Sequence, residues 1–89
     1  MIDYKNYDLN SDDIDFIKEL EKSCIIEQNE ITLECRGNQF VLEPQGKKLE
    51  IYAYGKVIGT YTCFEDFLLQ YKIDDKPIIE LINEIDYAE

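Results

Sequence analysis

The stretch ITLECRGNQFVLEPQGKKLEIYAYGKVIGTYT, residues 31–62, decides the fold of this chain. Its apolar residues alternate with polar ones, as Ile31, Leu33 and Cys35 show, and this alternation is typical of a strand with one buried face. Three more such runs follow, and turn-forming residues separate them at Gly37-Asn38, Pro44-Gln45-Gly46 and Gly55-Lys56. Because short turns join neighbouring strands in opposite directions, the stretch predicts a four-stranded antiparallel meander.

Helical patterns flank the meander on both sides. Asn10 is a good N-cap, and Ile17 and Leu20 follow at helical spacing, so we expect a helix that begins after Asn10 and ends near Ser23. Beyond the meander, the apolar spacing predicts a second helix over about residues 63–71 and a third helix that Asp75 caps.

The expected fold class is therefore α+β. An N-terminal helix, a four-stranded antiparallel meander sheet and two C-terminal helices follow one another as α-β-β-β-β-α-α, with the helices on one face of the sheet. The 89 residues suffice for a single domain over 1–89. Two segments stay open: residues 1–9 form a loose arm or pack Tyr4, Tyr7 and Leu9 onto the body, and residues 24–29 form a strand or a loop.

The chain is strongly acidic, with a formal net charge of −11. Residues 1–30 hold nine acidic and three basic residues, residues 65–89 hold eight and two, and the middle of the chain is close to neutral. Such a protein repels nucleic acid and anionic membrane surfaces and attracts basic proteins. The simpler alternative is that the charge serves solubility alone.

The sequence lacks the residue types on which most catalytic and metal sites depend. It has no histidine, its four glycines are scattered, and Arg36 is its only arginine. A histidine-based triad, a phosphate-binding glycine loop and a clamp of several arginines are all excluded. We therefore expect a protein that is not an enzyme and that uses no cofactor and no metal.

The cysteines Cys24, Cys35 and Cys63 are odd in number and widely spaced. They form no Cys-x-x-Cys pair, so we expect reduced thiols and a cytoplasmic protein. The first residues show no basic region followed by an apolar one, and no apolar run approaches the roughly 20 residues of a membrane span. We accordingly expect neither a secretory signal nor a membrane anchor.

Two groups of residues are candidates for binding a partner. The first is acidic and consists of Asp12, Asp13, Asp15, Glu19, Asp74, Asp75, Glu80, Glu84 and Asp86. The second comprises Tyr52 and Tyr54, which we expect to point outward beside Glu50 if Leu49, Ile51 and Ala53 face the core; exposed tyrosines are enriched at interfaces. The simpler alternatives are an ordinary solvated surface and tyrosines that stabilise cross-strand pairs.

The stretch FEDFLLQYKIDDKPIIELI, residues 64–82, resembles the C-terminal part of small proteins carried by phages and mobile elements of low-GC Gram-positive bacteria. Small acidic proteins of that setting include anti-CRISPR proteins, other inhibitors of defence systems, and immunity proteins that neutralise toxins. The resemblance carries no catalytic motif. It implies a protein that acts by binding.

The negative net charge, the two tyrosines and the resemblance together predict an inhibitor that binds a larger basic protein. The expected partner is a nucleic-acid-binding effector such as a CRISPR nuclease complex, whose channel the acidic protein would occupy. Two alternatives stay open: an immunity protein or antitoxin that binds a cationic toxin, and a phage structural or assembly protein that forms homo-oligomers. We expect a monomer or a homodimer without direct contact with nucleic acid.

Overall fold

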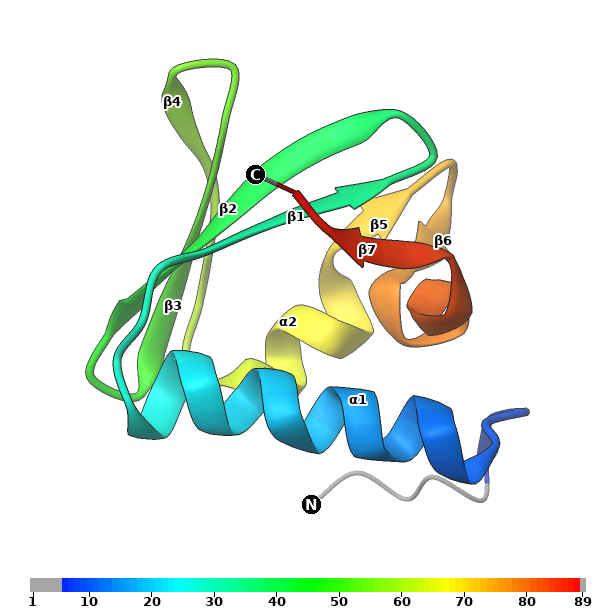
Figure 1. Cartoon of the computed structure of the whole chain (residues 1–89). Helices are drawn as coiled ribbons and strands as arrows, with labels where there is room; N and C mark the ends of the chain where they lie inside the picture. Colours follow the sequence, from blue (N-terminus) through cyan, green and yellow to red (C-terminus); the bar gives the residue numbers. More distant parts are fainter. Residues whose placement is uncertain (1–5, 89) are drawn as a thin grey trace.

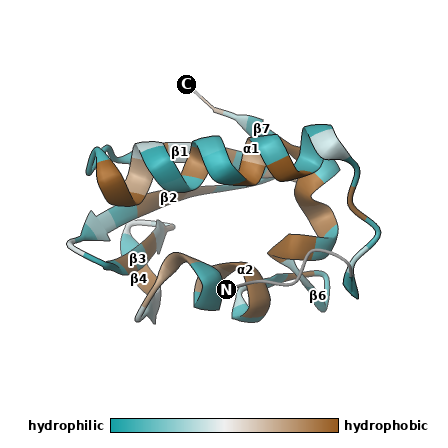
Figure 2. Cartoon of the chain, turned by 90° about the horizontal axis from the view of Figure 1, so that it is seen from below, coloured by the Kyte–Doolittle hydropathy of each residue, from teal (hydrophilic) through white to brown (hydrophobic). Residues whose placement is uncertain are grey.

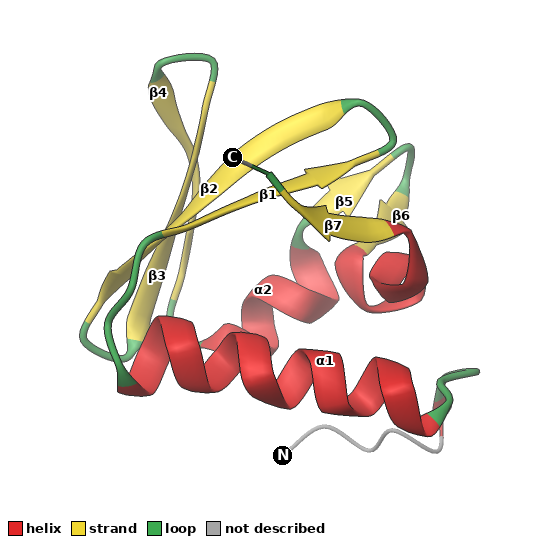
Figure 3. Cartoon of the chain, in the orientation of Figure 1, coloured by secondary structure: helices red, strands yellow, loops and turns green. Residues whose placement is uncertain are grey.

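The structure of the chain, a computed structural model, describes residues 6–88 (Figure 1). Figure 3 distinguishes its helices and strands by colour. The described elements are α1 (Ser11–Glu21), the π-helix η2 (Lys22–Ile26), β1 (Ile31–Cys35), β2 (Asn38–Gln45), β3 (Lys48–Ala53), β4 (Lys56–Tyr61), α2 (Phe64–Gln70), β5 (Lys72–Ile73), β6 (Lys76–Pro77), the 3-10 helix η3 (Ile78–Glu84) and β7 (Ile85–Tyr87).

The main sheet has five antiparallel strands in the order β4-β3-β2-β1-β7. Its first four strands are the expected meander, and the α+β class is confirmed. The four-stranded layout itself is wrong, because β7 returns to pair with the open side of β1 and sets Cys35 opposite Ile85. A strand of three residues is too short to show alternation in the sequence.

Two-residue turns with positive φ at both positions close three of the hairpins. This conformation fits the right-handed twist of paired strands and is therefore favoured in two-residue hairpin turns. The two meander turns begin one residue earlier than the sequence suggested, so Tyr54 lies in a turn rather than in β3. The turns are Arg36-Gly37 (φ 52° and 80°), Tyr54-Gly55 (54° and 78°) and Asp74-Asp75 (54° and 65°).

Pro44 does not interrupt β2, which continues to Gln45. The pairing between β1 and β2 ends at Ile31 and Leu42. Beyond that point β2 pairs with β3 alone, and Pro44 lies opposite Leu49. A proline is tolerated there because the ladder between β1 and β2 has already ended and needs no N–H from it.

The first helix begins where its cap predicts and extends further than expected. Asn10 Oδ1 accepts a hydrogen bond from the Asp13 N–H at 2.8 Å, and Asp13 Oδ2 accepts one from the Asn10 N–H at 3.3 Å. The helix does not end near Ser23, because η2 continues the coil to Ile26 and buries Cys24 against the core. Residues 24–29 are thus the end of a helix followed by a loop.

The third expected helix is a 3-10 helix, and Asp75 does not cap it. Asp75 lies in the turn between β5 and β6, and Pro77 occupies the N-cap position of η3. Burial in η3 repeats every three residues, with Ile78, Ile79, Leu81 and Ile82 buried and exposed residues between the pairs. A repeat of three matches the three residues per turn of a 3-10 helix.

The core lies between the helices and one face of the sheet. Figure 2 shows hydrophilic and hydrophobic bands alternating along α1, as expected for a helix that buries one side. Phe67 of α2 is fully buried at the centre of an aromatic cluster. Its ring centroid lies 5.6 Å from Phe64, 5.7 Å from Tyr71, 6.0 Å from Tyr61 and 6.4 Å from Phe40.

The segment before α1 packs onto this core in its described part. Tyr7 and Leu9 are partly buried against it, and the Leu9 N–H donates a hydrogen bond to the Tyr7 carbonyl at 2.9 Å. The expectation for Tyr4 lies outside the described residues. No helix within residues 6–88 is long and apolar enough to cross a membrane.

Candidate protein-interaction surface

The face of the sheet turned away from the helices (Figure 1) is here called the outer face. The strand register places three rows of side chains across it. The residues next to them in sequence, such as Leu33, Leu42 and Ile51, are fully buried. Because successive side chains of a strand point to opposite faces, the side chains of the three rows point outward. By cross-strand register the rows are Thr32-Val41-Tyr52-Val57, Glu43-Glu50-Thr60 and Asp86-Glu34-Gln39.

The central row is apolar and partly exposed. Tyr52 retains 37% of its accessible surface and Val57 retains 43%, while the neighbouring Ile58 retains 39%. Val41 lies directly opposite Tyr52 on β2 and is half-buried. Exposed large apolar side chains that lie side by side mark interaction surfaces more strongly than scattered ones do.

Carboxylates crowd one side of this row. Glu43 and Glu50 lie directly opposite each other on β2 and β3, a like-charge pair that destabilises a sheet. The pKa of Glu43 is raised above its usual value, first by desolvation, then by the negative charges of Glu30 and Glu50 and by a side-chain hydrogen bond with Glu30. The three carboxylates therefore form a cluster in which ionisation of Glu43 is less favourable than in the unfolded chain.

We expect Glu43→Gln to stabilise the isolated protein at neutral pH. A carboxyl whose pKa is raised by folding contributes stability below its unfolded pKa of about 4.3, and this contribution is lost as the pH rises through the folded value. The urea midpoint of Glu43→Gln should therefore exceed that of the wild type at pH 7, and the gap should close in acid. Glu80→Gln, on the exposed side of η3, is the matched control. An unchanged or lower midpoint for Glu43→Gln at pH 7 would contradict the cluster.

The four acidic candidates of the first helix lie on α1, on the helical side of the molecule. Asp12, Asp15 and Glu19 are exposed there. Asp13 has a structural task, because it completes the capping box with Asn10. The helix therefore presents three solvent-facing carboxylates that are separate from the outer face.

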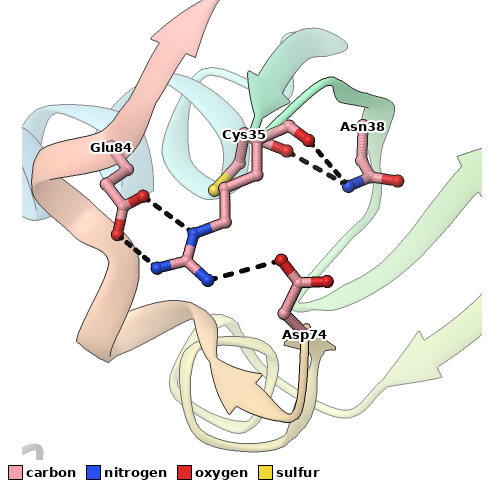
Figure 4. A network of polar contacts seen from close by, with 5 residues as sticks. Cys35, Asn38, Asp74 and Glu84 are labelled. Carbon is pink, nitrogen blue, oxygen red and sulfur yellow. Dashed lines mark hydrogen bonds and ion pairs between the residues drawn. The ribbon is translucent and has the colours of Figure 1, made fainter.

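Two further acidic candidates bind Arg36 (Figure 4). Glu84 accepts two hydrogen bonds from the guanidinium, from Nε at 2.8 Å and from Nη2 at 2.9 Å, and Asp74 accepts one from Nη1 at 3.3 Å. The hydrogen bonds from Arg36 are the largest of the effects that lower the pKa of Glu84. The three residues join the β1–β2 turn, the β5–β6 turn and the end of η3, which makes them a structural clamp.

The remaining candidates lie at two other places. Asp75 occupies the β5–β6 turn and Glu80 is exposed on η3. Tyr54 is 81% exposed, and its hydroxyl donates to Asn38 Oδ1 at 3.4 Å. A pocket of about 200 Å³ opens beside it, lined in part by Tyr71 and Lys72. Its volume lies below the roughly 300–1,000 Å³ of most small-molecule sites.

Cys24 and Cys35 differ from activated nucleophiles. Desolvation raises the pKa of Cys24 to about 11 and also raises the pKa of Cys35. A thiol with a raised pKa stays protonated at neutral pH and reacts slowly. Within residues 6–88, no group of three histidine, cysteine or acidic residues is placed to hold a metal ion.

The twelve candidates thus separate into four places: α1, the clamp with its neighbouring turn and η3, the β3 side of the outer face, and the β7 edge of that face, where Asp86 lies opposite Glu34. Glu50, Tyr52 and Asp86 share the outer face, with Tyr54 at its end. Sequence reasoning missed Glu30, Glu43, Val41 and Val57 as members of the surface. The signal that would have found Glu43 and the two valines is the strand register, which the two-residue turns fix.

Comparison of the chain with protein-family models, with curated proteins and with solved structures found no match.

Proposed function

We propose that the protein is an inhibitor that binds a larger basic protein through its outer face and acts by occupancy rather than by catalysis. The observation that carries the proposal is the partly exposed apolar row at Val41, Tyr52 and Val57 beside the carboxylates of Glu30, Glu43 and Glu50. A lysine or arginine of a partner would relieve the repulsion within the carboxylates, while the row would bury apolar area.

The charge of the whole molecule supports a basic partner. A net charge of −11 on 89 residues attracts cationic surfaces over several ångströms and speeds association. The exposed carboxylates of α1, Asp12, Asp15 and Glu19, add to this field without touching the outer face. We therefore assign steering to the helix and affinity to the outer face.

The class of partner follows from the chemistry of the surface. Proteins that bind nucleic acid line their channels with lysine and arginine, which neutralise phosphates. Carboxylates spaced along neighbouring strands offer such a channel a substitute for phosphates. We propose a nucleic-acid-binding effector, of which a CRISPR nuclease complex is one kind, as the partner whose channel is blocked.

A tagged pull-down from lysate of the native host, washed at low and at high salt, tests this function. Exposed charges are screened beyond about 8 Å at 0.15 M salt and beyond about 3 Å at 1 M salt. We expect one large basic protein to stay bound to the tagged chain in the low-salt wash and to be released in the high-salt wash. The purified partner should then lose its affinity for DNA or RNA when the protein is added.

Two outcomes would redirect the assignment. A small cationic toxin in place of a nucleic-acid-binding protein would make the chain an immunity protein. A basic partner that stays bound at high salt and still binds nucleic acid in the complex would contradict inhibition by occupancy.

A further inference from the structure

We propose that β4, the edge strand of the main sheet, pairs with the β4 of a second copy of this chain, so that two five-stranded sheets join into one. This inference goes beyond the inhibitor function and does not depend on it. It concerns the hairpin of β3 and β4 (Lys48–Tyr61) at the end of the sheet opposite β7.

The backbone of β4 is open on one side. In the described part of the chain, β4 pairs with β3 alone, whereas β3, β2 and β1 each have two neighbours. Alternate residues of such an edge direct their N–H and C=O groups away from the sheet, where they can pair with another strand. At six residues, β4 is twice as long as β7, the strand at the opposite edge.

The side chains of β4 favour association at this edge. The register shift after Tyr52 leaves Ile58 as an extra residue, so Val57 and Ile58 are adjacent and both exposed, at 43% and 39%. The strand carries one charged residue, Lys56, at its turn end. Edges that avoid association carry inward charges, prolines, several lysines or a bulge; β4 has the bulge at Ile58 but no proline, and Lys56 is its single charged residue.

The distribution of charge indicates a second copy rather than a basic partner at this edge. The hairpin of residues 48–61 contains Lys48, Glu50 and Lys56 and has a net charge of +1, so the rest of the chain carries −12. Two copies repel each other over most of their surface. At the hairpin, two copies can come into contact with little electrostatic repulsion. The hairpin also offers few carboxylates to a cationic protein.

Paired antiparallel about a two-fold axis, the two copies would present their outer faces on one continuous sheet. A closed two-fold pairing uses the same edge on both copies and leaves no β4 edge open for further growth. A joined sheet would offer a partner two equivalent copies of the Tyr52 row.

Light scattering on the purified full chain, without any partner, tests the proposal. We expect the mass to rise with protein concentration from 10.5 kDa toward twice that value. The rise should be stronger at about 1 M than at about 0.15 M salt, because salt screens the repulsion between two acidic chains. This salt dependence is opposite to that of the inhibitor complex, so failure of one proposal is distinguishable from failure of the other. A mass of one chain at all concentrations and both salts would overturn the pairing.

Ile58→Glu and Ile26→Glu form a matched pair of variants. Both replace an exposed isoleucine, at 39% and 74%, and only Ile58 lies on β4. We expect Ile58→Glu to keep the mass of one chain while Ile26→Glu associates like the wild type, with circular dichroism confirming that both are folded. Equal association of the two folded variants would overturn the proposal.

Hydrogen exchange on the unaltered chain gives a readout that does not rely on a variant. Protection of the β4 amides should increase as the mass rises. A mass that doubles while β4 protection stays constant would place the contact elsewhere.

Discussion

Phe67→Ala should remove a large share of the protein's free energy of unfolding. The ring is fully buried and touches aromatic residues from β2, β4 and its own helix, as the Phe40 and Tyr61 contacts show. Replacing a buried phenylalanine by alanine costs about 3–5 kcal/mol, and a domain of this size holds only about 5–15 kcal/mol in total. Urea denaturation followed by far-ultraviolet circular dichroism measures the loss, because the chain has no tryptophan to report by fluorescence.

Phe16→Ala is the control for this effect. Phe16 is half-buried on α1 and makes one edge-to-face contact with Tyr87, at 5.7 Å between ring centroids. The loss of such a pair costs about 0.5–1.5 kcal/mol beyond the buried area. Equal destabilisation by the two substitutions would show that Phe67 is not the centre of the core.

Tyr52→Ala should weaken binding to the basic partner by at least about 30-fold, which corresponds to roughly 2 kcal/mol. Tyr52 is the largest side chain of the central row and lies between Val41 and Val57 on the neighbouring strands. A tyrosine at the centre of an interface buries a large rigid area at little entropic cost. Isothermal titration calorimetry with the purified partner measures the change in Kd.

Tyr54→Ala separates the centre of this surface from its rim. Tyr54 lies in the turn at the end of β3 with 81% of its surface exposed, and its φ of 54° suits alanine no worse than tyrosine. We expect a loss of only a few-fold in affinity, since rim residues contribute little. If Tyr54→Ala costs more than Tyr52→Ala, the contact is centred on the turn and not on the outer face.

The meander could be predicted because two independent signals agree there. Alternation indicates which residues are buried, as it does for Leu49, Ile51 and Ala53, and the turn residues indicate the strand ends to within about one or two residues. The first helix follows in the same way from its cap at Asn10. Such local signals lie within a few residues of one another and need no knowledge of the rest of the fold.

The elements that could not be predicted depend on distant parts of the chain. Strand β7 is three residues long and exists because β1 has an open side. The apolar residues from Ile78 to Ile82 fit a repeat of three as well as one of 3.6, so the sequence does not separate a 3-10 helix from an α-helix. In both cases tertiary packing decides the outcome.

The interaction surface could be predicted only in part, again because part of it depends on tertiary packing. Tyr52 and Glu50 follow from the alternation in one strand, whereas the place of Glu43 opposite Glu50 requires the register between two strands. The clamp was out of reach, because Arg36 and Glu84 are 48 positions apart in the chain. Two acidic residues expected to face a partner, Asp74 and Glu84, therefore bind Arg36 in the folded protein.

Amide chemical-shift mapping of the labelled protein with its purified basic partner tests the central claim most directly. We expect the largest changes on the outer face, at Val41, Tyr52 and Val57 and at the neighbouring Glu43. The amides of Asp12, Asp15 and Glu19 should change little, because α1 acts through its long-range field. Chemical-shift changes confined to α1, with the outer face unaffected, would contradict binding through the outer face and would assign binding to the helix.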